Sequence, residues 1–247
     1  MLVFDFGRNK PPRASIRGCL RQAVKNGLRP NTVIDVGVAY ETQALYDVFK
    51  YAKFILIEPV KEFVPHLENI VSRLNDAEFI LAAASNERGD TIINVHPDLV
   101  GSSLYKEEEN SDVNGVERTV PVVTLDDLCR ERNTRGPYLI KIDTQGSEID
   151  VLMGAETVLQ ETEFVILEVS LFEFFRNGPQ IYDYITFMKD RGFVPYDIFD
   201  LQYRPLDGAM SQIDMAFVRE NGHLRRYHFY ATREQRREQN KSLTKRR

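Results

Sequence analysis

The segment Thr32-Val-Ile-Asp-Val-Gly37 decides the fold of this sequence. Its β-branched residues predict a buried strand that ends at Gly37. Residues 41–49 follow with apolar side chains at helical spacing, and residues 53–57 form the next apolar run, which ends at Glu58-Pro59. A strand, a helix and a strand in this order predict a βαβ unit with parallel strands.

The same alternation continues toward the C-terminus. We expect helices at 61–74, 125–131 and 181–191, a helix that opens at 146–148, and strands at 77–84, 91–96, 119–123, 138–142 and 163–169. The last two strands, 193–199 and 212–219, have no helix between them, which indicates antiparallel pairing. The sequence therefore predicts an α/β fold with a seven-stranded, mostly parallel sheet and an antiparallel edge strand.

Composition limits the class of protein. The 247 residues suit one domain, and 43% hydrophobic residues are enough for a core, which excludes global disorder. No apolar stretch approaches the ~18–20 residues of a membrane helix, and the first ten residues lack the order of a signal peptide. Cys19 and Cys129 are too few for a disulfide framework or a zinc site, so we expect a cytoplasmic protein.

The net charge of −5 conceals two parts of opposite sign. Residues 225–247 carry nine Lys or Arg against two acids, a charge of +7, and residues 1–224 carry −12. An acidic body argues against nucleic-acid binding over the whole surface. We expect an N-terminal helical extension at 1–30, an α/β domain at 31–222 and a basic C-terminal tail at 223–247.

Acidic residues stand where the predicted strands end, at Asp35, Glu58, Asp143 and Glu168. Ligands of parallel sheets bind outside the carboxyl ends of the strands, so these residues mark a candidate site. Glu58 follows Asp35 by 23 residues, the spacing of an acid that accepts hydrogen bonds from a ribose diol. The single glycine and the nearby acids disfavour a pyrophosphate and favour a cationic, phosphate-free nucleoside such as S-adenosylmethionine.

Several ordered blocks of this sequence resemble the FkbM-type S-adenosylmethionine-dependent methyltransferases. They include Val33-Ile-Asp-Val-Gly37, Glu58-Pro59, Ala82-Ala-Ala-Ser85, Val123-Thr-Leu-Asp-Asp127 and Ile140-Lys-Ile-Asp-Thr-Gln-Gly-Ser-Glu148, within residues 32–219. The last block, whose Asp143 follows Thr124 by 19 residues, is the most specific. The resemblance implies a Rossmann-like class I methyltransferase fold, and methylation of a hydroxyl oxygen on a sugar or small metabolite.

The resemblance also implies roles for individual residues. The methionine part of the cofactor would meet Asp35, Gly37, Val38, Ala39 and Tyr40, with Thr42 donating to its carboxylate. The nucleoside would meet Glu58 at the ribose, and Pro59, Val60, Ala83, Ala84 and Ser85 around the adenine. Asp143 would stand beside the sulfonium and is the first candidate for a general base, with Glu168 and His96 as weaker ones.

Alternatives remain open at this point. Asp143 and Glu168 could hold a divalent metal, although two acids on neighbouring strand ends are common without one, and we predict no metal. Glu41 stands where the family usually has glycine, which favours a catalytically silent binding module. A nucleotide-dependent oxidoreductase or epimerase is the other alternative. Lys141 is expected to pack its stem and expose its amine.

The expected partner is a small-molecule or sugar acceptor, with neither nucleic acid nor membrane. The aromatic cluster that follows Glu168, at Phe172, Phe174, Phe175, Tyr182 and Tyr184, is interpreted as core, with an acceptor wall as the alternative. The basic tail is expected to be solvated. Its alternatives are docking on a second subunit, which would make a homo-oligomer, and attraction of an anionic acceptor.

Overall fold

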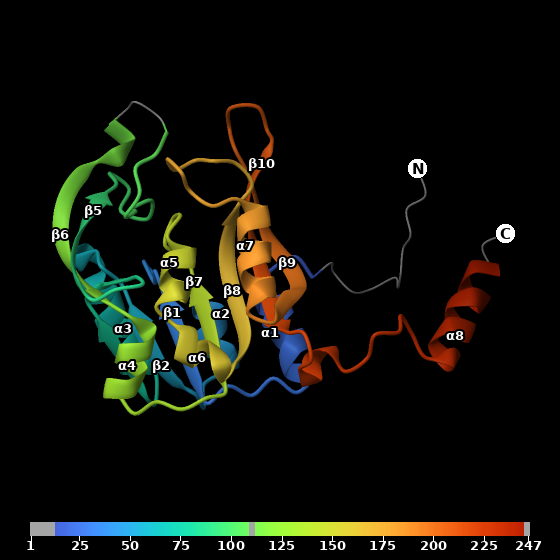
Figure 1. Cartoon of the computed structure of the whole chain (residues 1–247). Coiled ribbons are helices and arrows are strands. Elements are labelled where there is room, and N and C mark those ends of the chain that lie inside the picture. The colour runs from blue at the N-terminus through green and yellow to red at the C-terminus, as the bar shows by residue number, and fades with distance from the viewer. Residues whose placement is uncertain (1–12, 109–111, 245–247) are drawn as a thin grey trace.

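A seven-stranded sheet organises the chain in this computed structural model, which describes residues 13–108 and 112–244 (Figure 1). The strand order is β3-β2-β1-β7-β8-β10-β9, with all neighbours parallel except that β10 is antiparallel to both β8 and β9. The strands are β1 (Thr32–Val36), β2 (Lys53–Ile57), β3 (Ala77–Ile80), β7 (Tyr138–Ile142), β8 (Thr162–Ser170), β9 (Phe193–Tyr203) and β10 (Met210–Arg219). The predicted mostly parallel sheet with antiparallel pairing at one edge is confirmed.

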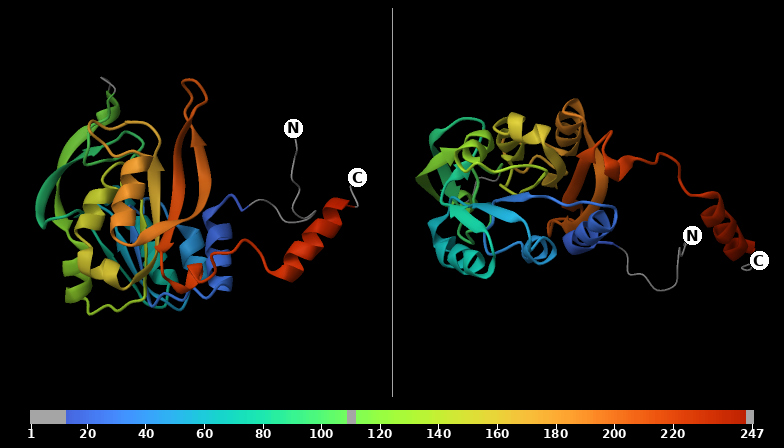
Figure 2. Two further views of the ribbon diagram at one scale, coloured as in Figure 1. Left: turned by 45° about the vertical axis from the view of Figure 1, so that its right-hand side comes forward. Right: turned by 90° about the horizontal axis from the view of Figure 1, so that it is seen from below.

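Helices cover both faces of this sheet, as the view from below shows (Figure 2). One face packs against α1 (Ile16–Lys25), α2 (Gln43–Val48) and α3 (Val64–Arg73). The other packs against α4 (Leu125–Glu131), α5 (Glu148–Met153), α6 (Glu156–Gln160) and α7 (Ile181–Asp190). Alternate residues of each central strand face opposite cores, as in Val33 and Ile34, so these strands are apolar throughout.

The helix α1 belongs to this layered core. Its Cys19, Leu20 and Ala23 are fully buried in the same cluster as α2, and its N-terminus is capped by the Ser15 side chain, which accepts from the Gly18 N–H. The expected N-terminal extension therefore includes a helix that packs on the sheet. Residues 1–12 of that extension lie outside the described residues.

A second, three-stranded sheet was not predicted. It has the order β4-β6-β5, from β4 (Ala83–Ala84), β6 (Val116–Val123) and β5 (Gly89–Val95). The strand expected over residues 77–84 is wrong as one element, because the chain turns after Ile80 and Ala83 and Ala84 pair with β6 instead. Alternate residues of β5 and β6, such as Ile93 and Val122, pack with Phe63 in a separate apolar cluster.

The C-terminal segment leaves the layered body. After the 3-10 turn His223–Arg225, an extended stretch leads to α8 (Arg233–Thr244), which stands clear of both sheets (Figures 1 and 2). Tyr227, Phe229 and Tyr230 in that stretch are exposed. Within residues 13–108 and 112–244, no helix combines the length and the apolar character needed to cross a membrane.

The ends of β1 and β7 approach each other closely at Gly37. This residue has φ +74°, and a Cβ built on it would lie 1.8 Å from the Asp143 carbonyl oxygen. The Asp143 N–H also donates to the Val36 carbonyl over 3.0 Å. The missing side chain of Gly37 therefore makes room for the backbone of the neighbouring strand end.

We expect Gly37→Ala to lower the free energy of unfolding by at least about 3 kcal/mol, because it adds a backbone clash to the strain of a positive φ. Gly208→Ala is the matched control, with φ +73° and, among the described residues, nothing within 4 Å of the new Cβ. The control should lose only about 1 kcal/mol. Urea unfolding measures both, and equal losses would contradict this account of Gly37.

Candidate active site

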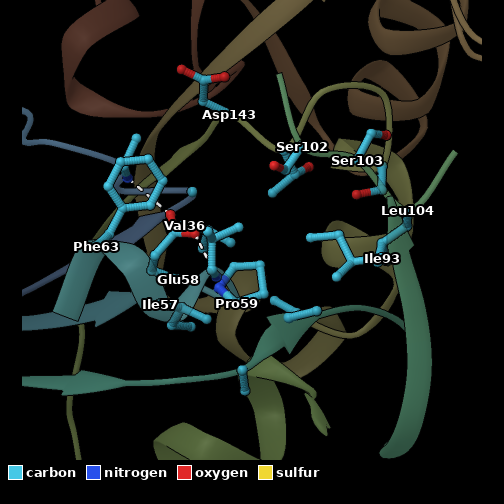
Figure 3. Close-up of a pocket in the computed structure, with 18 of the residues that line it drawn as sticks. Val36, Ile57, Glu58, Pro59, Phe63, Ile93, Ser102, Ser103, Leu104 and Asp143 are labelled. Carbon is cyan, nitrogen blue, oxygen red and sulfur yellow. Dashed lines mark hydrogen bonds between the residues drawn. The ribbon is translucent and has the colours of Figure 1, made fainter. Parts of the chain in front are cut away.

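A cavity opens at the carboxyl ends of β1, β2 and β7, with about 580 Å³ of empty space including its mouth (Figure 3). This is the switch point of the sheet, because the chain runs from β1 to β2 on one side and returns to β7 on the other. Eight of the predicted residues line it: Gly37, Ala39, Glu58, Pro59, Val60, Ala83, Ala84 and Asp143.

Five predicted cofactor residues lie outside the cavity wall: Asp35, Val38, Tyr40, Thr42 and Ser85. Val38 is buried in the core beside α2, and Tyr40 is half exposed with its ring edge-on to Phe63. Thr42 occupies the position before α2, and Ser85 bonds to its neighbour Asn86. The loop after β1 therefore meets the cavity only through Gly37 and Ala39.

One wall of the cavity comes from residues that sequence reasoning missed. This wall consists of Ile93 of β5, Phe63, and the loop residues Leu99, Val100, Ser102, Ser103 and Leu104. This loop folds back because Ser103 and Asn94 exchange backbone hydrogen bonds, and the Ser103 hydroxyl donates to the Gln145 carbonyl over 2.6 Å. The only signal in the sequence was the apolar pair Leu99-Val100 within a polar segment.

Glu58 joins two loops at the cavity. Its two carboxylate oxygens accept the Ala39 and Val60 N–H groups, each over 2.9 Å. Burial raises the pKa of Glu58, and these two hydrogen bonds oppose that shift. A carboxylate oxygen has a second lone pair, so Glu58 keeps acceptor capacity on the cavity side for a ribose diol.

The Glu41 side chain lies outside the cavity. Its carboxylate lies 2.6 Å from an Arg73 guanidinium nitrogen, at a surface position, and it is absent from the cavity wall. A side chain in place of the usual family glycine is thus accommodated on the outside. Glu41 in place of glycine was the main sequence argument for a catalytically silent binding module, and this placement removes it.

Asp143 stands at the end of the cavity opposite Pro59, with its carboxylate directed away from that proline (Figure 3). Its Oδ2 lies 3.1 Å from Lys141 Nζ, and its Oδ1 accepts from Gln145 Nε2 over 3.0 Å. The Asp143 side chain remains 30% exposed, so it is accessible. The expectation that the Lys141 amine is exposed is wrong, because acids on neighbouring strands compensate its burial.

Glu168 is buried behind this rim and does not line the cavity. It accepts hydrogen bonds from the side-chain amides of Gln145, Gln202 and Gln212, over 2.7, 3.0 and 2.9 Å. We call these three residues the glutamine collar. Burial, followed by the nearby acids, raises the pKa of Glu168 well above its usual value. Gln145 thus links the two predicted catalytic acids through one amide group.

The loop between β7 and α5 is held by buried groups. The Glu148 carboxylate accepts from the Thr144 and Gly146 N–H groups and from the Tyr184 hydroxyl. Phe175 packs on Gly146, where any Cβ would meet its ring at 2.8 Å. These two aromatic residues of the cluster are buried, as the core interpretation expects. Phe172 and Phe174 are only partly buried and Tyr182 is exposed, so the core interpretation is wrong for Tyr182. In the part of the chain that the structure describes, no group of three or more His, Cys, Asp or Glu could hold a metal.

The strand order and the cavity at the switch point define a Rossmann-like class I methyltransferase fold. The family model described as "Methyltransferase FkbM domain" matches residues 34–195, which is more than half of the chain. The chain belongs to this family, so the resemblance seen in the sequence is confirmed. It is therefore an S-adenosylmethionine-dependent methyltransferase, which replaces the oxidoreductase or epimerase alternative.

Solved structures with similar folds share little sequence with the chain. Magnesium protoporphyrin IX methyltransferase from Synechocystis PCC 6803 is 11% identical, with TM-score 0.44 and 87% of each chain covered. The 1,6-didemethyltoxoflavin-N1-methyltransferase from Burkholderia thailandensis is 10% identical, with TM-score 0.45, covering 82% of this chain and 76% of that one. No curated protein matches the chain.

The residues at the cavity suit the cofactor, S-adenosylmethionine, on chemical grounds. Glu58 offers acceptors for ribose hydroxyls, and Asp143 offers negative charge to a cation. Asp35 does not line the cavity, but it is fully buried, and its Oδ1 is the one buried side-chain N or O atom in the described residues without a hydrogen-bond partner. Its charge therefore acts on the cavity through space rather than by contact.

We expect Glu58→Gln to weaken binding of S-adenosylhomocysteine at least tenfold. An amide supplies fewer acceptors for the ribose, and its NH₂ group would face a backbone N–H of Ala39 or Val60. Isothermal titration calorimetry measures the dissociation constant. Glu62→Gln, at an exposed glutamate paired with Arg118, is the control and should bind normally. An unchanged affinity in Glu58→Gln would remove the ribose assignment.

Proposed function

We propose that this methyltransferase methylates a hydroxyl oxygen of a sugar or another small metabolite. The observation that carries the proposal is the carboxylate of Asp143, which is accessible at the rim of the cavity and oriented by Lys141 and Gln145. A hydroxyl acceptor must lose its proton, and a carboxylate within hydrogen-bond reach can take it.

When bound, S-adenosylmethionine supplies an electrophilic methyl group on a sulfonium that departs as a neutral thioether. The remaining work belongs to the chain. Asp143 would accept the hydroxyl proton, while the Lys141 ammonium and the Gln145 amide hold its two oxygens in place. Glu168 would serve as the anchor of the glutamine collar, because three amides surround it and it lies outside the cavity wall.

The glutamine collar favours an acceptor rich in hydroxyl groups. An amide side chain has one acceptor oxygen and two N–H donors, so it can bond a hydroxyl in either sense. Gln202 and Gln212 are cross-strand partners on the β9–β10 hairpin, and the pairing of that hairpin is irregular on both sides of Gln212. Such irregularities re-aim side chains next to active sites. The acids beneath the collar disfavour an anionic acceptor.

We expect Asp143→Asn to lower kcat for methyl transfer about 100-fold or more, while the affinity for S-adenosylhomocysteine changes less than threefold. The assay offers free sugars, glycosides and polyols with S-adenosylmethionine labelled with ¹³C at the methyl group. Mass spectrometry and the ¹³C shift then identify a methyl ether. Asp90→Asn, at an exposed residue of β5, is the control. A methylated nitrogen in the product, or full activity in Asp143→Asn, would refute the proposal.

We further propose that residues 226–244, the C-terminal arm, dock on a second copy of this chain. The arm carries the exposed Tyr227, Phe229 and Tyr230 and lies in a region of strongly positive charge, whereas residues 1–224 carry −12. Attraction between these parts favours a homo-oligomer over binding to nucleic acid or a membrane. The two cysteines are free and buried, in keeping with the cytoplasm as the proposed compartment.

Truncation after Leu224 should convert the oligomer to a monomer, because it removes the arm and leaves the layered body intact. Multi-angle light scattering of the full and truncated chains at low salt measures the mass. Raising the salt concentration should shift the full chain in the same direction, since the attraction is electrostatic. The same mass for both chains would end this proposal.

A further inference from the structure

A single buried lysine links strand β1 to the loop that follows β7. Lys141 Nζ lies 3.1 Å from Asp143 Oδ2 and 4.0 Å from Asp35 Oδ1, and the lysine side chain is 8% exposed. Lys141 and Asp35 are register partners on adjacent parallel strands. Lys141 and Asp143 are two residues apart, so both project to the same face of the sheet. One ammonium therefore bridges β1 and the loop after β7 at the switch point.

Further acids surround this lysine from the neighbouring elements. They are Glu58 after β2, Glu168 on β8, Asp214 on β10 and, beside Asp214, Asp200 on β9. Burial raises the pKa of Asp35, Glu58 and Asp214, the last to about 7, and the charge of Lys141 lowers the pKa of each of these three. The protonation of Asp35, Glu58 and Asp214 thus depends on Lys141.

The hydrogen bond of Lys141 goes to the less buried of its two partners. Asp35 is fully buried and its Oδ1 has no hydrogen-bond partner in the described residues, although Tyr46 donates to its Oδ2 over 2.8 Å. A lysine that served burial alone would bond the acid whose charge is most costly to bury. Lys141 instead bonds Asp143, which is 30% exposed at the cavity rim.

We propose that Lys141 is a positioning residue, whose ammonium orients the carboxylate of Asp143 at the rim of the cofactor cavity and couples it to Asp35 on β1. The inference rests on the proposed role of Asp143. Asp143 Oδ2 is held by Lys141 and Oδ1 by Gln145, so the direction of the carboxylate is set from both sides. Lys141 itself does not line the cavity, so it acts on the site through Asp143.

The test compares two ligands that differ by one charge and needs no acceptor. S-adenosylmethionine carries a sulfonium, and S-adenosylhomocysteine carries a thioether in its place. Calorimetry between pH 5.5 and 9 gives the ratio of their dissociation constants, which reports the negative charge that faces the sulfonium. The preference for the sulfonium should weaken as the pH falls and the acids bind protons.

We expect Lys141→Met to move the midpoint of that pH dependence upward by one pH unit or more, which is a tenfold change in proton affinity. The acids lose the cation that keeps their proton affinity low. Lys141→Arg should restore the wild-type midpoint. Lys53→Met is the matched control, because Lys53 pairs with Asp76 and Glu78 away from the cavity, and it should leave the midpoint unchanged.

An unchanged midpoint in Lys141→Met, or an equal shift in Lys53→Met, would overturn the inference. If Lys141→Met does not fold, the double variant Lys141→Met with Asp35→Asn removes the cation together with its buried partner, and the same shift is expected. Failure to find any methylated hydroxyl would count against the proposed function and leave the calorimetric result intact. Normal methyl transfer with an unchanged midpoint would overturn only the role of Lys141.

Discussion

The close approach of two strand ends at Gly37 is the constraint on which the site depends. The missing side chain of Gly37 lets the Asp143 carbonyl pack against the loop after β1, and the Asp143 N–H bonds to Val36. The loop that presents Ala39 to Glu58 and the loop that carries Asp143 and Gln145 therefore share one edge of the sheet. The cavity at the switch point, which both loops line, follows from this contact.

Charge is the second organising feature of the site. Carboxylates from β1, β7, β8 and β10 lie on one face of the sheet, and burial raises the pKa of Asp35, Glu168 and Asp214. Amide donors surround Glu168, whereas an ammonium holds Asp143. Glu168 therefore anchors three side chains, whereas Asp143 remains accessible at the cavity. Two acids that look alike in the sequence thus occupy unlike surroundings.

Much of the fold could be predicted from the sequence. The strand at residues 138–142 and the helix at residues 125–131 were predicted with the bounds they have in the structure, because their apolar spacing is local and regular. The second sheet was missed because β4 has only two residues, and its pairing with β6 joins segments nearly forty residues apart. The cavity wall formed by residues 99–104 was missed for another reason, because a polar loop gives no periodic signal.

The sequence by itself determined the order of the elements, the family, and which acids stand at strand ends, because these depend on local spacing and on short ordered blocks. Only the tertiary structure decided which of these charged residues are buried and which partners they have. Lys141 is buried beside Asp35, Glu41 turns outward to Arg73, and Glu168 is enclosed by glutamines, because these partners come from distant segments. Electrostatic interactions act between neighbours in space, and a linear sequence does not specify which neighbours meet.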